Sequence, residues 1–109
     1  MSDTLHLRLI LDAIEVVREY TKGGREPFLG DPMRRDGVVW RLATIGEAVE
    51  DLSKEACAKE PHIPWRRIAG MRDRLIHGYA SVDFEIVWEV VEDQLDPLEQ
   101  AVRRLLGES

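Results

Sequence analysis

The chain has 109 residues, a single cysteine and a formal net charge of −6 at pH 7. That length predicts one domain spanning residues 1–109, and the lone Cys57 excludes an internal disulfide and fits a reducing cytoplasm. No apolar run reaches the roughly 18 residues that span a membrane, and the N-terminus lacks a signal-peptide pattern, so we expect a cytoplasmic protein without membrane contact.

The first predicted helix runs from about Thr4 to Lys22. Ser2 or Asp3 precedes it as a helix N-cap, and a pair of glycines ends it. His6 lies near its start and is expected at the surface rather than as a metal ligand. The apolar residues of this helix recur at helical spacing and predict a buried stripe made of Leu7, Ile10, Leu11, Ile14 and Val17.

Residues 23–31 are predicted to form a loop in which Phe28 packs against the core. Asp31 and Pro32 then have the residue types of an N-cap and a first helical position. They predict a long second helix that extends to about Ala58.

Gly46 lies inside this second helix, where glycine costs up to about 1 kcal/mol relative to alanine. A helix tolerates glycine most readily where another backbone comes close. Gly46 therefore predicts a tight helix crossing, within the chain or between subunits. Glu47 beside it is either an exposed carboxylate, which we favour slightly, or a support for an active site.

Prolines at positions 61 and 64 break the chain before a third helix, and His62 between them is expected to be solvated. Ile68, Met71 and Leu75 form the predicted core stripe of this helix. The adjoining face of the helix carries Trp65, Ala69, Arg72 and Ile76.

A last helical region begins after Ser81 and Val82, with Asp83 as its expected N-cap. Pro97 removes a backbone donor and should kink or split that region, which continues to about residue 106. Strand-like alternation is absent from the sequence. The predicted architecture is an all-α, up-down bundle of four to five helices.

Three side chains that can act on a phosphate group lie within eight residues: Arg72, His77 and Tyr79. Arginine binds phosphate oxygens in pairs, histidine can exchange protons near neutral pH, and tyrosine adds a hydroxyl. Five residues turn a helix by about 140° net, so Arg72 and His77 diverge on one continuous helix. They can converge if the helix ends near His77, where Gly78 tolerates positive φ, or if a second copy of the motif faces the first.

The surroundings of this motif are basic in an otherwise acidic chain. Residues 61–80 contain four arginines and one aspartate, whereas residues 81–109 contain two basic and eight acidic residues. A net charge of −6 argues against non-specific nucleic-acid binding. The basic segment is either a solvated helix face or a local site for a phosphate-bearing ligand.

Other common catalytic arrangements are missing from the sequence. It lacks a His-Glu-x-x-His motif, paired cysteine ligands, a nucleophile elbow and a Gly-rich phosphate loop ending in Lys-Ser/Thr. We therefore expect neither a metal ion nor another cofactor.

The pattern Arg-x-x-x-x-His-x-Tyr and its flanks resemble HepT-like proteins, a branch of the HEPN superfamily of helical ribonucleases. The resemblance covers about residues 5–106. One departure is Asp73, since the family often has asparagine after the arginine; a carboxylate there could orient His77 or lower the local positive charge. The matching flanks are Ile45–Ala48, Ile63–Arg66, Ile68–Arg72, Val82–Asp83 and Ile86–Glu89.

The resemblance implies a metal-independent endoribonuclease with Arg72 and His77 as catalytic residues and with Asp73 and Tyr79 in support. RNA supplies its own nucleophile, the 2′-hydroxyl, so histidine need only move a proton and arginine need only stabilise phosphate charge. The expected products carry a 2′,3′-cyclic phosphate and a 5′-hydroxyl. One histidine serves one proton transfer at a time, and a two-fold homodimer would bring a second Arg72 and His77 to the same cleft.

The resemblance also implies a toxin–antitoxin pair. The antitoxin of this family, MntA, is a nucleotidyltransferase that silences the toxin by transferring AMP to the motif tyrosine, here Tyr79. Without the resemblance, Tyr79 could simply pack and hydrogen-bond at the helix end. Two alternatives stay open: a catalytically weak helical module that binds a nucleotidyltransferase, and a helical dimerisation domain.

Overall fold

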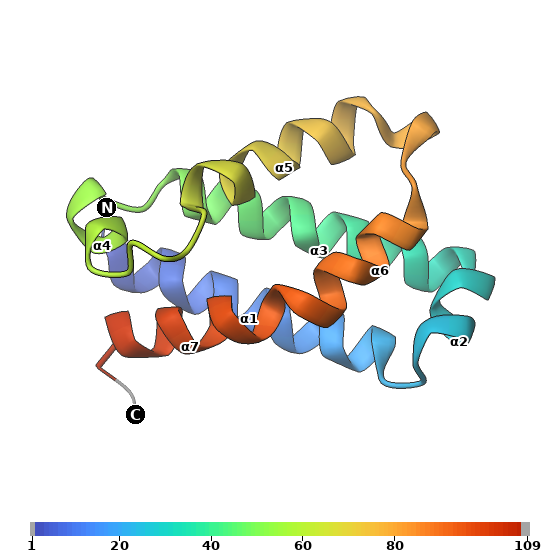
Figure 1. The fold of residues 1–109 in the computed structure, drawn as a ribbon, viewed down its shortest axis with the longest axis horizontal. Coiled ribbons are helices and arrows are strands. Elements are labelled where there is room, and N and C mark those ends of the chain that lie inside the picture. Colours follow the sequence, from blue (N-terminus) through green and yellow to red (C-terminus); the bar gives the residue numbers. More distant parts are fainter. Residues whose placement is uncertain (1, 108–109) are drawn as a thin grey trace.

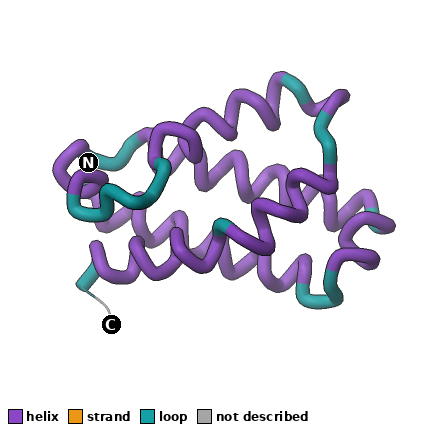
Figure 2. Tube along the Cα trace, viewed as in Figure 1, coloured by secondary structure: helices purple, strands orange, loops and turns teal. Residues whose placement is uncertain are grey.

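The computed structural model describes residues 2–107, and all regular secondary structure in that range is helical (Figures 1 and 2). Five helices have ten or more residues, which confirms the predicted all-α bundle. The helices are α1 (Asp3–Thr21), α2 (Arg25–Gly30), α3 (Pro32–Glu50), α4 (Lys54–Ala58), α5 (Trp65–His77), the 3-10 helix η1 (Tyr79–Ser81), α6 (Phe84–Asp93) and α7 (Leu95–Leu105).

The long helices run alternately up and down the bundle (Figure 1). Helix α3 lies between α1 and α5, and the α6–α7 segment returns along the bundle so that α7 packs beside α1. The short helices α2 and α4 close opposite ends. The largest fully buried side chains come from α1, α2, α3 and α7: Phe28, Ile10, Ile14, Leu42, Ile45, Val17, Val38 and Val102.

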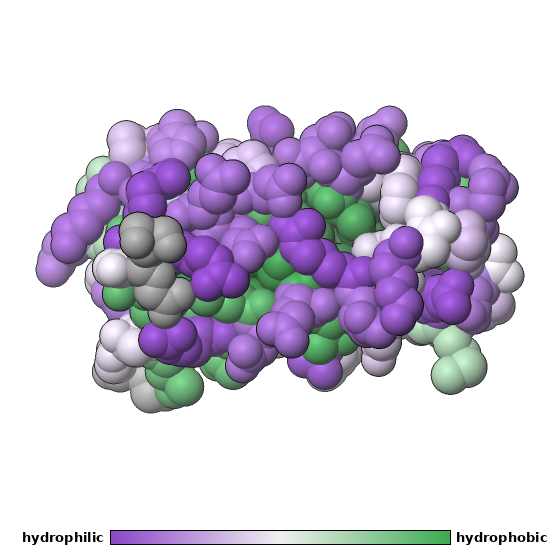
Figure 3. Space-filling model, turned by 90° about the horizontal axis from the view of Figure 1, so that it is seen from below, coloured by the Kyte–Doolittle hydropathy of each residue, from purple (hydrophilic) through white to green (hydrophobic). Residues whose placement is uncertain are grey.

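Polar side chains cover most of the face drawn in Figure 3, and apolar surface shows in patches between them. Within residues 2–107, no helix combines the length and the apolar character that crossing a membrane requires.

The predicted start of α1 is confirmed, because the Thr4 backbone N–H donates to the Ser2 hydroxyl at 3.1 Å. The predicted surface position of His6 is wrong, since its side chain is buried. His6 lies one helical turn before Ile10, on the same stripe that faces the core.

The predicted loop over residues 23–31 is wrong in part, because α2 forms there. Its Phe28 is fully buried, with its ring centroid 5.7 Å from that of Trp88 and 6.5 Å from that of Phe84. This packing folds a segment whose glycine and proline content had suggested a loop. The next N-cap is confirmed, since the Asp31 carboxylate accepts from the Met33 N–H at 2.9 Å.

The predicted extension of α3 to Ala58 is also wrong, because the helix ends at Glu50. Ser53 caps the separate helix α4 by accepting from the Ala56 N–H at 3.1 Å. Asp3 holds Ser53 in place by accepting from its N–H at 2.9 Å and its hydroxyl at 2.6 Å, which lowers the pKa of Asp3. These side-chain hydrogen bonds offer the backbone an alternative to continuing the helix.

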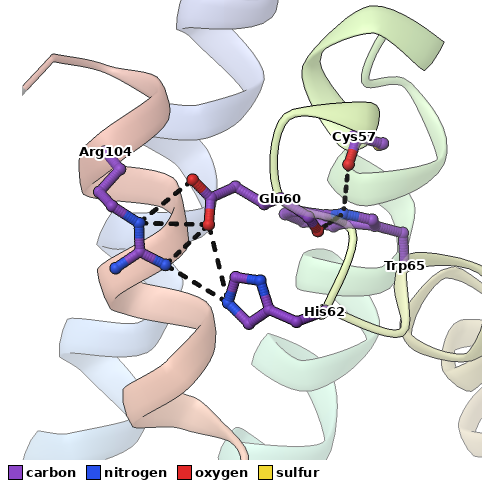
Figure 4. Close-up of polar contacts among 5 residues, drawn as sticks. All are labelled: Cys57, Glu60, His62, Trp65 and Arg104. Atoms are coloured by element: carbon purple, nitrogen blue, oxygen red, sulfur yellow. Dashed lines mark hydrogen bonds and ion pairs between the residues drawn. The ribbon is translucent and has the colours of Figure 1, made fainter.

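A polar cluster fixes the segment that leads into α5 (Figure 4). Glu60 accepts from Arg104 of α7 at 2.7 to 3.2 Å, and the guanidinium holds the pKa of the Glu60 carboxyl below its usual value. The indole N–H of Trp65 donates to the carbonyls of Cys57 and Glu60 at 3.0 and 2.9 Å. His62 is mostly exposed, with its Nε2 atom 3.4 Å from the Arg104 guanidinium. The start of α5 is thereby tied to both α4 and α7.

The predicted N-cap Asp83 is confirmed by its acceptance from the Glu85 N–H at 2.9 Å. The predicted break at Pro97 is confirmed as well, because α6 ends at Asp93 and α7 begins at Leu95. A proline ring clashes with the carbonyl four residues before it, which here belongs to Asp93.

The tight crossing predicted at Gly46 lies within the chain, between α3 and α5. A Cβ atom at this position would lie 2.9 Å from the carbonyl oxygen of Ile68 and 3.1 Å from the backbone nitrogen of Arg72. Gly46 thus lets α3 approach the part of α5 that carries Arg72.

We expect Gly46→Ala to destabilise the protein by about 1–2 kcal/mol, because the clash between backbones outweighs alanine's gain of about 1 kcal/mol in helix propensity. Gly70→Ala is the matched control in α5, where a Cβ atom has no neighbour within 4 Å. That substitution should stabilise the protein by up to about 1 kcal/mol. Urea unfolding of both variants measures the difference, and equal effects at the two positions would contradict the crossing.

Candidate active site

Helix α5 carries the motif and ends where the sequence predicted, at His77, with the Gly78 N–H donating to the Arg74 carbonyl at 3.1 Å. The backbone does not use the positive φ that glycine tolerates, because the φ of Gly78 is −103°. Glycine is required there for another reason: a Cβ atom would lie 2.7 Å from the Arg74 carbonyl oxygen.

Arg72 lies at the crossing of α5 and α3. Its Nε atom is 3.2 Å from the Glu47 carboxylate, and its Nη1 atom is 3.4 Å from the Asp73 carboxylate. Glu47 is exposed, as we slightly favoured, yet it also positions Arg72. Together with Trp40 and Ile76, Arg72 lines a surface hollow of about 350 Å³.

His77 faces a different hollow, of about 630 Å³, formed by the end of α5, η1 and the start of α6. Its exposed ring makes no hydrogen bond or ion pair with any residue in the range 2–107, so both ring nitrogens remain available. One chain therefore does not bring Arg72 and His77 to a single hollow. This arrangement agrees with the 140° divergence expected from their spacing.

Tyr79 is the first residue of η1, and its side chain is 44% exposed. Its hydroxyl donates to the Asp36 carboxylate of α3, and this bond raises the pKa of Tyr79. Its ring meets the edge of the Phe84 ring at a centroid distance of 6.3 Å. Asp36 is not among the site residues predicted from the sequence, because no local pattern links residues 43 positions apart.

The basic character of the segment comes from four arginines on α5. Arg72 is ion-paired as described above. Within the described part of the chain, the side chains of Arg66, Arg67 and Arg74 make no hydrogen bond or ion pair. Residues 2–107 contain no group of three or more His, Cys, Asp or Glu side chains placed to hold a metal ion.

Sequence comparison decides the family. A family description for "Ribonuclease HepT-like" proteins matches residues 10–105. The chain belongs to the HepT-like ribonuclease family. The resemblance read from the motif is thus confirmed.

Three relatives illustrate the match. "Putative RNase TTE0752" of Caldanaerobacter subterraneus is 41% identical over 102 residues, which cover 93% of this chain and 91% of the relative. "Probable ribonuclease HepT" of Thermococcus cleftensis is 36% identical over 92% of each chain. "Gamma-glutamylcyclotransferase and putative RNase MJ0434" of Methanocaldococcus jannaschii is 38% identical, and the match covers 95% of this chain but 47% of the relative. No solved structure matched the chain significantly.

Within this HepT-like chain, the exposed groups suit phosphate chemistry. A free imidazole can take or give a proton, and a guanidinium can stabilise charge on a phosphate in the transition state. In this chain the imidazole of His77 and the guanidinium of Arg72 lie in two different hollows.

Proposed function

We propose that this HepT-like protein is a metal-independent endoribonuclease in which Arg72 and His77 act on the scissile phosphate. The ribose 2′-oxygen attacks phosphorus, the bond to the 5′-oxygen breaks, and the products carry a 2′,3′-cyclic phosphate and a 5′-hydroxyl. His77 removes the 2′-hydroxyl proton or protonates the leaving oxygen, and Arg72 stabilises the phosphate. The observation that carries this proposal is the unpartnered His77 at the end of α5 in a member of a ribonuclease family.

The site is proposed to form in a two-fold homodimer, because Arg72 and His77 of one chain line different hollows. An apolar rim beside Arg72 supports this arrangement. The side chain of Trp40 is 63% exposed, and Ile76 is also exposed in the same hollow. Exposed large apolar side chains that cluster on a surface are typical of an interface.

Cleavage of RNA by the purified protein should persist in EDTA, because the proposed mechanism uses only Arg72, His77 and the 2′-hydroxyl. Replacing the ribose at the cleaved linkage by 2′-deoxyribose should stop the reaction, since the nucleophile is removed. Gel analysis with end-group determination measures both effects. Cleavage that disappears in EDTA and returns with Mg²⁺ would contradict the mechanism.

Silencing is proposed to occur at Tyr79, through AMP transfer by an MntA-like nucleotidyltransferase that acts as the antitoxin of this toxin. The Tyr79 hydroxyl lies two residues beyond His77 at an exposed turn, so a transferase could reach it without unfolding the core. An attached AMP would place phosphate charge and bulk beside the site where RNA phosphate binds.

A second candidate is a catalytically weak partner of a nucleotidyltransferase. It is favoured by the two carboxylates, Glu47 and Asp73, that already contact Arg72, and by the net charge of −6. Incubating the partner-free protein with RNA separates the candidates, because this one predicts no cleavage above a buffer control.

A further inference from the structure

The hollow beside His77 is larger and more apolar than the transfer of one proton requires. Its volume of about 630 Å³ is within the range of small-molecule sites, which is about 300–1,000 Å³. Most of its wall is apolar and comes from Leu75, Val82, Ile86 and Val87. Ile86 is 58% exposed, so part of this wall is open to solvent.

Arg74 lines the same hollow and shares a helix face with His77. Residues three apart on a helix are neighbours on its surface, whereas the five-residue spacing of Arg72 and His77 separates those two. The side chain of Arg74 is exposed and makes no hydrogen bond or ion pair within residues 2–107. Its five donors are therefore free to bind a phosphate next to His77.

We propose that this hollow binds one unpaired nucleobase of the RNA strand next to the scissile linkage, while Arg74 binds the phosphate attached to that nucleotide. This inference rests on the ribonuclease function proposed above. The apolar wall covers the face of the base, and the guanidinium neutralises backbone charge in a protein whose net charge is −6.

The polar groups of the hollow predict which bases it favours. Asp73 and Asp83 both line it, and each carboxylate keeps one oxygen without a hydrogen-bond partner among the described residues. Carboxylates accept hydrogen bonds and cannot donate them when ionised. Adenine, cytosine and guanine each carry an exocyclic amino group with two donor hydrogens, whereas uracil offers only its single ring N3–H as a donor. The hollow should therefore discriminate against uracil at one position flanking the cut.

The test uses oligodeoxynucleotides with a single ribonucleotide, which confines cleavage to one linkage, and varies the base on each side of it. For the wild-type protein, uracil at one flank should lower kcat/KM. Arg74→Gln should raise KM about tenfold with little change in kcat, as expected for loss of one charge-assisted contact. Ile86→Trp, which fills the hollow, should raise KM and flatten the base preference.

Matched control substitutions are available at exposed positions outside this hollow. Arg67→Gln removes another exposed arginine of α5 that lines a different hollow, and Leu9→Trp adds a tryptophan at an exposed position of α1. Both should keep the wild-type KM and base preference. Arg74→Gln changes only an exposed side chain, so it decides the question even if Ile86→Trp does not fold.

Wild-type KM and base preference in both the Arg74→Gln and Ile86→Trp proteins would overturn the inference while leaving the ribonuclease proposal intact. A wild-type protein that cleaves none of the substrates would contradict the ribonuclease proposal instead. Fluorescence anisotropy with an all-deoxy oligonucleotide then still compares binding by the wild-type and Arg74→Gln proteins. Equal affinity in that assay would overturn the inference as well.

Discussion

Replacing His77 by alanine is expected to reduce RNA cleavage by at least about a hundredfold, the usual contribution of a positioned general acid or base. Arg72→Ala should cause a loss of about a hundredfold or more, because it removes a donor to the transition-state phosphate. Single-turnover cleavage of a labelled RNA measures both. His77 is exposed and Arg72 lies at the edge of packed surface, so circular dichroism should show an intact helical fold.

A matched control is Arg66→Ala, which removes an exposed arginine of the same helix that makes no ion pair within residues 2–107. Its cleavage rate should stay close to that of the wild type. Full activity in the His77→Ala protein would rule out the proposed mechanism.

Mixing the two inactive variants tests whether the site is shared between subunits. A mixed dimer pairs the intact His77 of one chain with the intact Arg72 of the other. If the reacting pair comes from opposite subunits, the mixture should recover a measurable part of the wild-type rate after the subunits exchange. Continued inactivity, with exchange demonstrated by sedimentation or mass spectrometry, would place both groups in one subunit.

Much of the fold could be predicted from local signals. Ser2, Asp31 and Asp83 cap helices as their residue types suggest, and Pro97 divides the last helical region. These features depend on hydrogen bonds and steric clashes between residues that are close in the sequence, so the residue types alone predict them.

The errors have a different origin, because they depend on contacts between distant segments. Helix α2 forms because Phe28 packs against Phe84 and Trp88, and α3 stops early because Asp3 holds the Ser53 cap. No short pattern reveals such partners.

In the candidate site, too, local spacing could be predicted from the sequence and contacts between distant segments could not. The spacing of Arg72 and His77 predicted their divergence, and the spacing of Arg74 and His77 could have predicted a shared face in the same way. The contacts of Arg72 with Glu47 and of Tyr79 with Asp36 join α5 and its exit to α3. They follow from how the helices pack, so only the structure reveals them.

The hydrogen bond of the Tyr79 hydroxyl to Asp36 bears on the proposed AMP transfer. In the free protein its hydroxyl donates to Asp36, and the raised pKa means that it keeps its proton more firmly than an ordinary tyrosine. The oxygen must lose this proton as it attacks the α-phosphate of ATP, while its lone pairs stay free in the bond to Asp36. The bond lies at the surface, so it should not prevent the reaction.

We expect that the cognate nucleotidyltransferase with ATP adds one or more AMP groups to Tyr79 and switches the ribonuclease off. Tyr79→Phe keeps the ring against Phe84 and removes only the acceptor oxygen, so it should retain much of the cleavage activity and escape silencing. Cells that express it together with the partner should then suffer greater toxicity than cells with the wild-type pair. Intact-mass and peptide mass spectrometry, combined with cleavage assays before and after transfer, measure these effects.

The second tyrosine of the chain provides the control for this experiment. Tyr20 is 40% exposed, nearly as much as Tyr79, but it lies on α1. The Tyr20→Phe protein should therefore be modified and silenced like the wild type, because it keeps the Tyr79 hydroxyl. Modification that persists in the Tyr79→Phe protein, or silencing of that protein by AMP transfer, would show that the acceptor lies elsewhere. An acceptor far from His77 would also remove the physical reason for silencing, since added phosphate charge blocks RNA only where RNA phosphate must bind.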